Sequence, residues 1–167
     1  MLVQVEVVGV RIEMPSNQPI VLLKEIDGTR FLPIWVGAVE ATSIAFAQQG
    51  LEAQRPLTHD LIKDLLDRVD ITLTSVHITE IKDGVFYADL LLRNSEGALE
   101  PLSVRPSDAI AVALRTKSNI MVNSDLLDEV GIDIPEQVAS EASAAGDQEL
   151  EAFREFLDQI NPEDFAG

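Results

Sequence analysis

Two Asp-Gly pairs, at residues 27–28 and 83–84, each separate two runs rich in β-branched and aromatic residues. The flanking runs are residues 19–26 and 29–36 for the first pair, and residues 71–82 and 85–93 for the second. Glycine tolerates the positive φ of a tight turn, so an Asp-Gly pair between such runs predicts a β-hairpin. We therefore expect a fold built on antiparallel strand pairs, with any helices packed against them.

The remaining periodic segments complete an α+β prediction. Residues 2–12 alternate and are rich in Val, which predicts another strand. Pro33 cannot donate a hydrogen bond to a neighbouring strand, which places its strand at a sheet edge or a bulge. Two further strands are expected at residues 98–104 and 119–122. Helices are predicted at residues 38–49, 58–69, 108–117 and 124–130. The fold class is thus a mixed or antiparallel sheet of hairpins with three to four helices packed on it.

The chain is predicted to consist of one domain and a tail. Residues 1–135 contain all of the elements above. Residues 136–147 are small and polar and have little to bury, which predicts a flexible linker. Residues 148–167 begin with an amphipathic helix, followed by Asn161-Pro162 as a stop signal. Its apolar stripe is expected to dock on its own domain or on a sister subunit, or to bind a protein partner.

The formal net charge of −17 lies mostly in the C-terminal quarter of the chain. Residues 125–167 carry 13 acidic side chains and one basic side chain, Arg154. Phosphate backbones are bound mainly by Lys and Arg, so a chain this acidic is a poor nonspecific binder of nucleic acid. Any contact with nucleic acid is therefore expected to be local or bridged by a divalent cation.

Several classes of protein are excluded by what the sequence lacks. It has no Cys, which excludes a disulfide framework, a zinc–thiolate site and a cysteine nucleophile. No apolar run approaches the roughly 18 residues of a membrane helix. The N-terminal segment has no basic leader and already alternates like a strand. We expect a soluble, cytoplasmic protein that does not contact a membrane.

Two predicted helix starts combine groups that can bind an anion and move a proton. The first contains Arg55, Thr58, His59 and Asp60, and the second contains Arg105, Ser107 and Asp108. A helix N-terminus favours a phosphate, and Asp60 and Asp108 could share Mg²⁺ or Mn²⁺ if the two starts meet. The alternative is structural: Thr58 and Ser107 cap their helices, and the arginines pair with carboxylates.

Three other residues need an interpretation. Glu40 interrupts an apolar stretch, so its charge must be paired, reach solvent or serve a site. His77 falls within a predicted strand and is interpreted as structural. Trp35 is interpreted as a core residue rather than a platform on which a nucleobase stacks.

Four segments together resemble the bifunctional nuclease domain family. They are FLPIWVGAVEA (31–41), RPLTHDLIKDLL (55–66), DGVFYADLLL (83–92) and RPSDAIAVALR (105–115), and the resemblance extends over residues 3–133. The acidic tail resembles the extension of actinobacterial members. The resemblance implies an α+β domain that self-associates, as a dimer or trimer, and hydrolysis of DNA and RNA. The family's motif residues correspond here to Glu40, Arg55, Thr58, His59, Asp60, Arg105, Ser107 and Asp108.

The resulting hypothesis is a metal-dependent phosphodiesterase. Asp60 and Asp108, together with Glu40, would hold the cation, and His59 would act as general base or acid. Arg55 and Arg105 would stabilise the charge of the transition state, and Thr58 and Ser107 would contact the substrate. Two alternatives stay open: a non-catalytic interaction or regulatory module that uses the tail helix, and a sensor of a nucleotide or another small anion.

Overall fold

Both Asp-Gly pairs connect antiparallel strands in the computed structural model of the chain. β2 (Gln18–Glu25) pairs with β3 (Arg30–Trp35), and β4 (Thr72–Lys82) pairs with β5 (Val85–Asn94). Asp83 and Gly84 have φ values of 52° and 77°, which is the tight turn predicted. Gly28 does not have a positive φ. It is needed for space instead, because a Cβ there would lie 2.4 Å from Glu25 Oε2.

The structure describes residues 1–13 and 15–133. The predicted linker 136–147, the tail helix 148–167 and the last two residues of the predicted domain lie outside the described residues. Within the described part, nine strands form one sheet in the order β6-β5-β4-β8-β1-β2-β3-β9, with β7 also paired to β5. The other strands are β1 (Leu2–Glu13), β6 (Gly97–Ala98), β7 (Leu102–Val104), β8 (Asn119–Asn123) and β9 (Ile132–Asp133).

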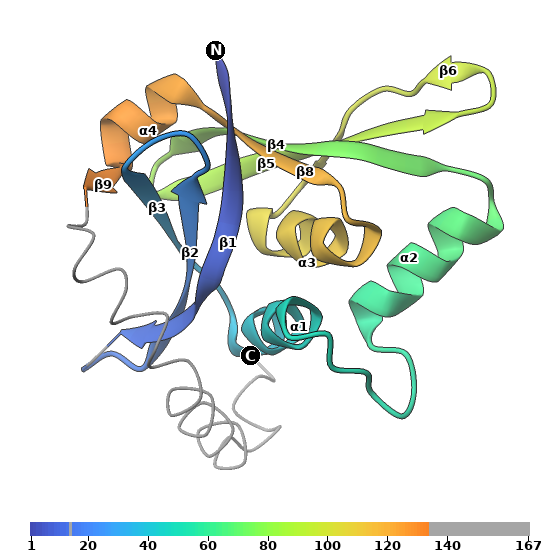
Figure 1. Cartoon of the computed structure of the whole chain (residues 1–167), viewed down its shortest axis with the longest axis horizontal. Coiled ribbons are helices and arrows are strands. Elements are labelled where there is room, and N and C mark those ends of the chain that lie inside the picture. The colour runs from blue at the N-terminus through green and yellow to red at the C-terminus, as the bar shows by residue number, and fades with distance from the viewer. Residues whose placement is uncertain (14, 134–167) are drawn as a thin grey trace.

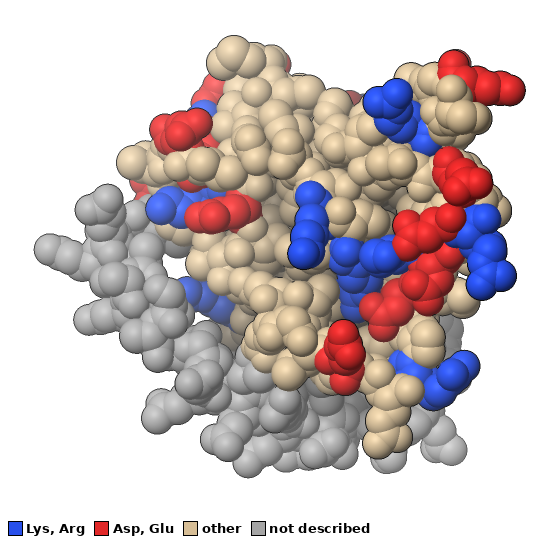
Figure 2. Space-filling model, turned by 45° about the vertical axis from the view of Figure 1, so that its right-hand side comes forward, with Lys and Arg blue, Asp and Glu red and all other residues tan. Residues whose placement is uncertain are grey.

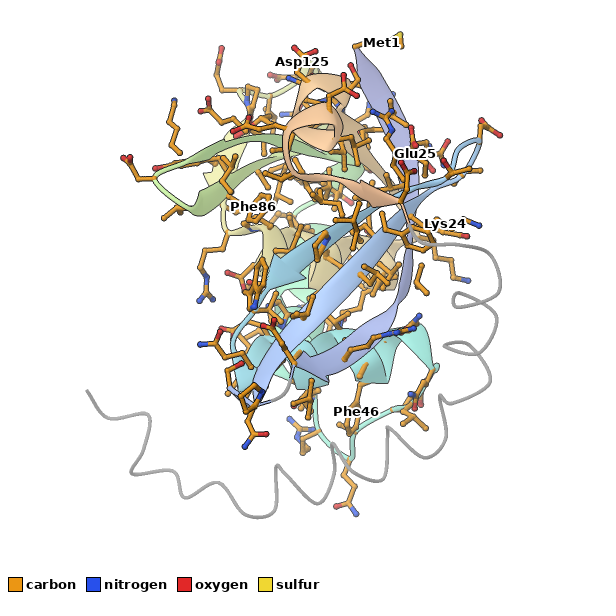
Figure 3. The ribbon with its side chains drawn as sticks, turned by 90° about the vertical axis from the view of Figure 1, so that its left-hand side faces the viewer. Met1, Lys24, Glu25, Phe46, Phe86 and Asp125 are labelled. Atoms are coloured by element: carbon orange, nitrogen blue, oxygen red, sulfur yellow. The ribbon has the colours of Figure 1, made fainter. Side chains whose placement is uncertain are left out.

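The sheet is two antiparallel units joined by one short strand. β8 lies between them, parallel to β4 and antiparallel to β1. The N-terminus is held beside this join, since Ser124 N donates to Met1 O at 2.8 Å. Figure 3 shows Met1 and Asp125 together at one end of the molecule and Phe46 at the other. The mixed sheet confirms the predicted α+β class.

Three helices lie on one side of the sheet, with α3 between α1 and α2 (Figure 1). Their bounds are Ala38–Gln48 for α1, Thr58–Arg68 for α2 and Pro106–Thr116 for α3. A fourth, α4 (Ser124–Val130), packs apart from them against β3, β4 and β8. The apolar face of α3 is fully buried, as Ile110 and Ala111 are 0% exposed. Because α3 packs against both α1 and α2, side chains from the first turns of α1 and α2 come together beside α3.

An ion-pair cluster away from these helices ties α4 to the first hairpin. Arg30 donates to both carboxylate oxygens of Glu25, at 2.6 Å and 2.9 Å, and also pairs with Asp128 of α4. Glu25 is 7% exposed. The hydrogen bonds from Arg30 hold the pKa of the Glu25 carboxyl below its usual value of 4.5.

The structure corrects both predicted hydroxyl caps of the site helices. Thr58 is the first residue of α2 and Leu57 precedes it as N-cap, without a side-chain cap. The α2 start is instead held by Asp60 Oδ2, which accepts from Leu57 N at 2.8 Å. Ser107 lies inside α3, which begins at Pro106 because proline is preorganised for the first helical position.

Two further predictions were wrong. The single strand expected at residues 98–104 is split into β6 and β7. Pro101 removes a donor between them, which ends the pairing. Trp35 is not a core residue, because 51% of it is exposed and its Nε1 donates to Glu13 Oε2 at 2.8 Å. Pro33 does lie where predicted, on a strand whose outer neighbour β9 pairs only with Arg30 and Phe31.

Candidate functional site

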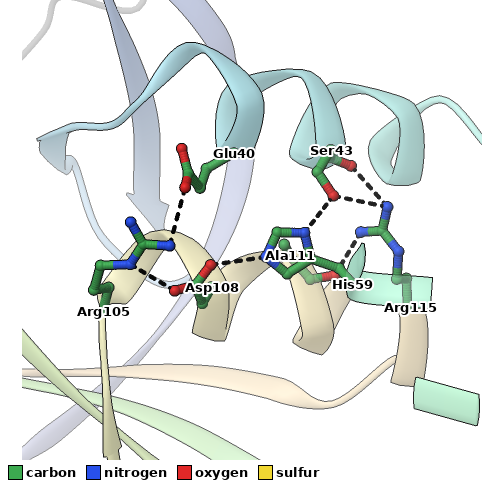
Figure 4. Close-up of polar contacts among 7 residues, drawn as sticks. All are labelled: Glu40, Ser43, His59, Arg105, Asp108, Ala111 and Arg115. Atoms are coloured by element: carbon green, nitrogen blue, oxygen red, sulfur yellow. Dashed lines mark hydrogen bonds and ion pairs between the residues drawn. The ribbon is translucent and has the colours of Figure 1, made fainter. Parts of the chain in front are cut away.

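A continuous chain of hydrogen bonds connects α1, α2 and α3 at the place where the three helices meet (Figure 4). Arg105, the N-cap of α3, occupies one end of this chain. Its Nη2 donates to Glu40 Oε1 of α1 at 2.9 Å, and its Nε donates to Asp108 Oδ2 at 2.7 Å. One guanidinium group therefore joins two carboxylates that are 68 positions apart in the sequence. Its side chain is 67% exposed, which leaves it able to move.

His59 forms the centre of the chain and is almost fully buried, with 4% exposed. Its Nδ1 lies 2.7 Å from Ser43 Oγ, and its Nε2 lies 2.8 Å from Asp108 Oδ1. Ser43 Oγ also accepts from Arg115 Nη2 at 3.0 Å, so this hydroxyl connects His59 to Arg115. Both ring nitrogens of His59 are therefore engaged, one by α1 through Ser43 and the other by α3 through Asp108.

Arg115 closes the other end of the chain and is more deeply buried than Arg105, with 7% of its side chain exposed. Its Nε donates to Asp60 Oδ1 at 2.5 Å, and its Nη atoms donate to Ala111 O and to Ser43 O. Asp60 thus has one oxygen on Arg115 and the other on Leu57 N. Its carboxylate is committed to holding α2 against α3.

The electrostatics keep both aspartates ionised. Burial alone would raise the pKa of Asp60, but the hydrogen bonds from Arg115 and Leu57 N outweigh it and lower the pKa below 3.8. Burial would likewise raise the pKa of Asp108. The hydrogen bonds with Arg105 and His59 outweigh this effect, so the pKa of Asp108 is also lowered. The hydrogen bond to Asp108 in turn raises the pKa of Arg105.

A cavity of about 500 Å³ opens along this network. Five of the residues singled out from the sequence line it: Glu40, Thr58, His59, Arg105 and Asp108. The rest of its wall is mostly aliphatic, from α1, α2, α3 and strands β5 and β7. Its form, an apolar hollow with a few convergent polar groups, is typical of a ligand site.

The other three predicted residues lie elsewhere. Asp60 does not line this cavity, because its carboxylate turns to Arg115. Arg55 is exposed, lies three residues before α2 and is also outside the lining. Ser107 is 7% exposed and faces a second cavity, of about 410 Å³, on the other side of Arg105.

The predicted cation ligands Asp60 and Asp108 point to different arginines, Arg115 and Arg105. Among the described residues, no group of three or more His, Cys, Asp or Glu side chains is arranged to hold a metal ion. Glu40 and Asp108, by contrast, converge on a single cationic group, the guanidinium of Arg105. Oxygen ligands from these two carboxylates are the kind that Mg²⁺ uses when it retains several waters.

Two members of the network, Ser43 and Arg115, were not singled out from the sequence. Ser43 lies in a stretch of small residues that predicts close helix packing, and nothing in its neighbours distinguishes it. Arg115 ends the segment RPSDAIAVALR, where an arginine after a wholly apolar helical turn is the one available signal. Its partner Asp60 is 55 positions away, which local patterns do not reveal.

Acidic and basic side chains are interspersed on the face shown in Figure 2, and the basic ones do not gather into a stripe. No helix in the described part of the chain has the length and apolar composition required to cross a membrane.

Comparison with known proteins identifies the relationship. The family model described as the bifunctional nuclease domain matches residues 21–135, which include every residue of the network. The chain belongs to the bifunctional nuclease domain family. An uncharacterized protein of Mycobacterium tuberculosis strain H37Rv is 47% identical to it over 164 residues, 97% of each chain.

Plant proteins named bifunctional nucleases are also similar to this chain. Bifunctional nuclease 1 of Arabidopsis thaliana is 32% identical over 114 residues, 66% of this chain and 35% of the plant protein. Bifunctional nuclease 1 of Oryza sativa subsp. japonica is 29% identical over 131 residues, 77% of this chain and 40% of the plant protein. This chain therefore matches well under half the length of each plant relative.

Proposed function

We propose that the protein hydrolyses phosphodiester bonds in DNA and RNA, and that the cavity bounded by Glu40, His59, Arg105 and Asp108 is its active site. The observation that carries this proposal is the convergence of Glu40 and Asp108 on one guanidinium group, with His59 bonded to the same Asp108 carboxylate. Family membership and the names of the plant relatives support the class of reaction.

In this proposal, Arg105 is the group that binds the substrate phosphate. Its exposed guanidinium can leave the two carboxylates and pair with a phosphate at the cavity, because exposed ion pairs contribute little stability. Glu40 and Asp108 would then face each other without their counter-ion. A divalent cation bound between them would polarise the phosphate and lower the pKa of an attacking water.

We assign proton transfer to His59. Its ring is held by Ser43 on one side and Asp108 on the other, which sets its orientation. Thr58 is exposed and lines the same cavity, which supports its proposed contact with the substrate. The proposed role of Arg55 as a second phosphate-binding group stays a prediction, as does cation binding by Asp60.

Cleavage of fluorescently labelled DNA and RNA by the full chain, with Mg²⁺, Mn²⁺ or EDTA, tests this proposal. The two histidines of the chain provide a matched pair of variants. We expect His59→Gln to abolish cleavage and His77→Gln, on β4, to retain it. Equal cleavage by wild type and His59→Gln, or cleavage unaffected by EDTA, would contradict the proposed site.

The choice of cation ligands has its own test. We expect Glu40→Gln and Asp108→Asn each to raise the Mn²⁺ concentration needed for half-maximal activity at least tenfold. Asp60→Asn is expected to change it little at temperatures where the variant remains folded. A larger increase in this Mn²⁺ concentration for Asp60→Asn than for Glu40→Gln would instead favour Asp60 and Asp108 as the cation ligands.

A structural role for the network is the competing proposal. Every carboxylate in it is paired, so the same side chains could act as a clamp between helices in a non-catalytic, self-associating interaction module. In that case the wild type would cleave nothing under any metal condition. Pull-down with and without residues 136–167 would then show whether the acidic tail binds a protein partner.

A further inference from the structure

Arg105 separates two hollows, and only one of them belongs to the site described above. The second, of about 410 Å³, lies between the end of β3, the β4–β5 turn and the start of α3. Trp35 and Phe86 supply aromatic surface to it, and Arg105 and Ser107 supply polar groups. Among the described residues that line the two hollows, Arg105 is the one that lines both, and it is the one Lys or Arg among them.

Trp35 presents an aromatic ring to this cavity from a fixed position. Its Nε1 donates to Glu13 Oε2 at 2.8 Å, so the polar edge of the indole is anchored on β1. About half of its surface, 51%, is nevertheless exposed. A large aromatic side chain that is held by its edge and exposed over its face is suited to stacking with another planar ring.

Two polar groups at the cavity have unused hydrogen-bonding capacity. Arg105 uses Nε and Nη2 on Asp108 and Glu40, and its Nη1 forms no hydrogen bond with another described residue. The Ser107 hydroxyl likewise forms none within the described ranges, although the residue is 7% exposed. An apolar partner would leave these donors unsatisfied, whereas a phosphate or a nucleobase edge would satisfy them.

We propose that this second cavity, named here the Trp35 cavity, is a subsite for one unpaired nucleobase whose adjoining phosphate binds Arg105. The inference rests on the proposed function, and it adds a substrate class. A nucleobase in a duplex has both faces covered by its neighbours and cannot stack on Trp35. The substrate is therefore single-stranded nucleic acid or a short oligonucleotide, held by one base and one phosphate instead of a long basic groove.

Trp35 is the one tryptophan of the chain, so intrinsic fluorescence reports directly on this cavity. The experiment titrates AMP into the full chain in EDTA, with ribose 5-phosphate as the matched probe that lacks a base. We expect saturable quenching by AMP, little change with ribose 5-phosphate, and at least a tenfold weaker AMP affinity in Arg105→Gln. The absence of quenching by millimolar AMP, or equal quenching by both probes, would overturn the subsite.

A second copy of the chain is the other occupant that could cover Trp35. Emission that changes with protein concentration, and that AMP does not alter, would show a self-association surface and overturn the proposal. Saturable quenching in a protein that cleaves nothing would support the subsite and contradict the nuclease function. The two proposals can therefore fail separately.

Kinetics on an active preparation provide the second readout. We expect Trp35→Leu to raise KM for a single-stranded oligonucleotide at least fivefold, with a smaller change in kcat. Tyr87→Leu is the matched control, because Tyr87 is 41% exposed but lies outside both cavities. Equal effects of the two variants on KM would overturn the role of Trp35.

Discussion

Arg115 keeps a positive charge almost out of contact with water, and its position explains why Asp60 is present. Only 7% of its side chain is exposed, and it donates hydrogen bonds to Asp60, Ser43 and Ala111. A buried guanidinium is tolerated when its charge is paired and its N–H groups are satisfied. Asp60 supplies the charge and the two other residues supply the acceptors, so Ser43 is held in place for His59.

We predict that Asp60→Asn lowers the free energy of unfolding by about 2–3 kcal/mol at pH 7, because it leaves Arg115 without its counter-charge. Urea denaturation measures this change. Asp67→Asn, on the same helix, removes the exposed pair with Lys63 and is the control, with an expected change of about 0.5 kcal/mol or less. Equal losses in the two variants would show that burial of Arg115 is unimportant.

Acid should weaken the network in a defined pH range. The pKa values of Asp60 and Asp108 are lower in the folded chain than their usual 3.8. Their stabilisation is therefore complete above about pH 4–5 and is lost as the pH falls below that range. Denaturation between pH 3 and pH 6 should show this loss in the wild type and less of it in Asp60→Asn.

His77 should give a separate pH dependence near neutrality. Burial lowers its pKa below 6.5, although Asp89 on the neighbouring strand opposes this shift. The unfolded chain then binds more protons than the folded chain, so stability falls as the pH decreases through 6.5. We predict that His77→Gln flattens the stability profile between pH 7 and pH 5, as measured by thermal unfolding. An unchanged slope would assign the dependence to another group.

At the scale of elements, the two Asp-Gly turns show that one sequence pattern can serve two purposes. Gly84 has a φ of 77° and nothing lies within 4 Å of a Cβ built there, so its role is conformational. Gly28 keeps space for the Glu25 carboxylate that pairs with Arg30. Substitution by alanine should separate these causes.

We predict that Gly84→Ala lowers stability by about 1 kcal/mol in any background, because left-handed backbone is unfavourable for alanine. Gly28→Ala should destabilise the wild type by displacing the Glu25 carboxylate, and much less in a Glu25→Ala background. A double-mutant cycle on urea denaturation measures the coupling between Gly28 and Glu25. Additive losses would show that Gly28 has a backbone role instead.

The sequence was sufficient to predict the four helices and the two hairpins, because each depends on local periodicity and turn chemistry. The sequence also singled out His59 and Asp108, which the structure brings within hydrogen-bond distance of each other. It could not predict that Asp60 would turn to Arg115, or that Ser43 would contact His59, because helix packing creates these contacts. The exposed position of Trp35 was missed for a related reason. Trp35 pairs with Ile20 at the end of β3 that β9 does not reach, and this tertiary arrangement leaves its side chain exposed.

At the scale of the whole molecule, a net charge of −17 and a single Lys or Arg lining the two cavities, Arg105, limit how nucleic acid can bind. Each phosphate neutralised by Lys or Arg makes binding depend more steeply on salt concentration. The proposed substrate contact involves Arg105 alone, so its electrostatic component is small. Most of the affinity would come from stacking and from the cation.

We predict a shallow salt dependence for a single-stranded DNA oligonucleotide bound in EDTA. The logarithm of the association constant should fall with the logarithm of the NaCl concentration with a slope of about −0.7, as expected for one phosphate contact on a single strand. Fluorescence anisotropy between about 50 and 200 mM NaCl measures it, the range over which salt effects are usually compared. A slope of about −4 or steeper would show that a basic surface binds several phosphates.

The position of β8 also affects how the sheet forms while the chain is being synthesised. Residues 119–123 insert between β1 and β4, and both of these strands precede them by at least 37 positions. Until the ribosome has released this segment, each half of the sheet presents an open edge that can pair with other chains. A stalled or truncated product that ends before Asn119 would therefore be prone to aggregation, and the pairing of β8 with both neighbours is the step that removes these two open edges.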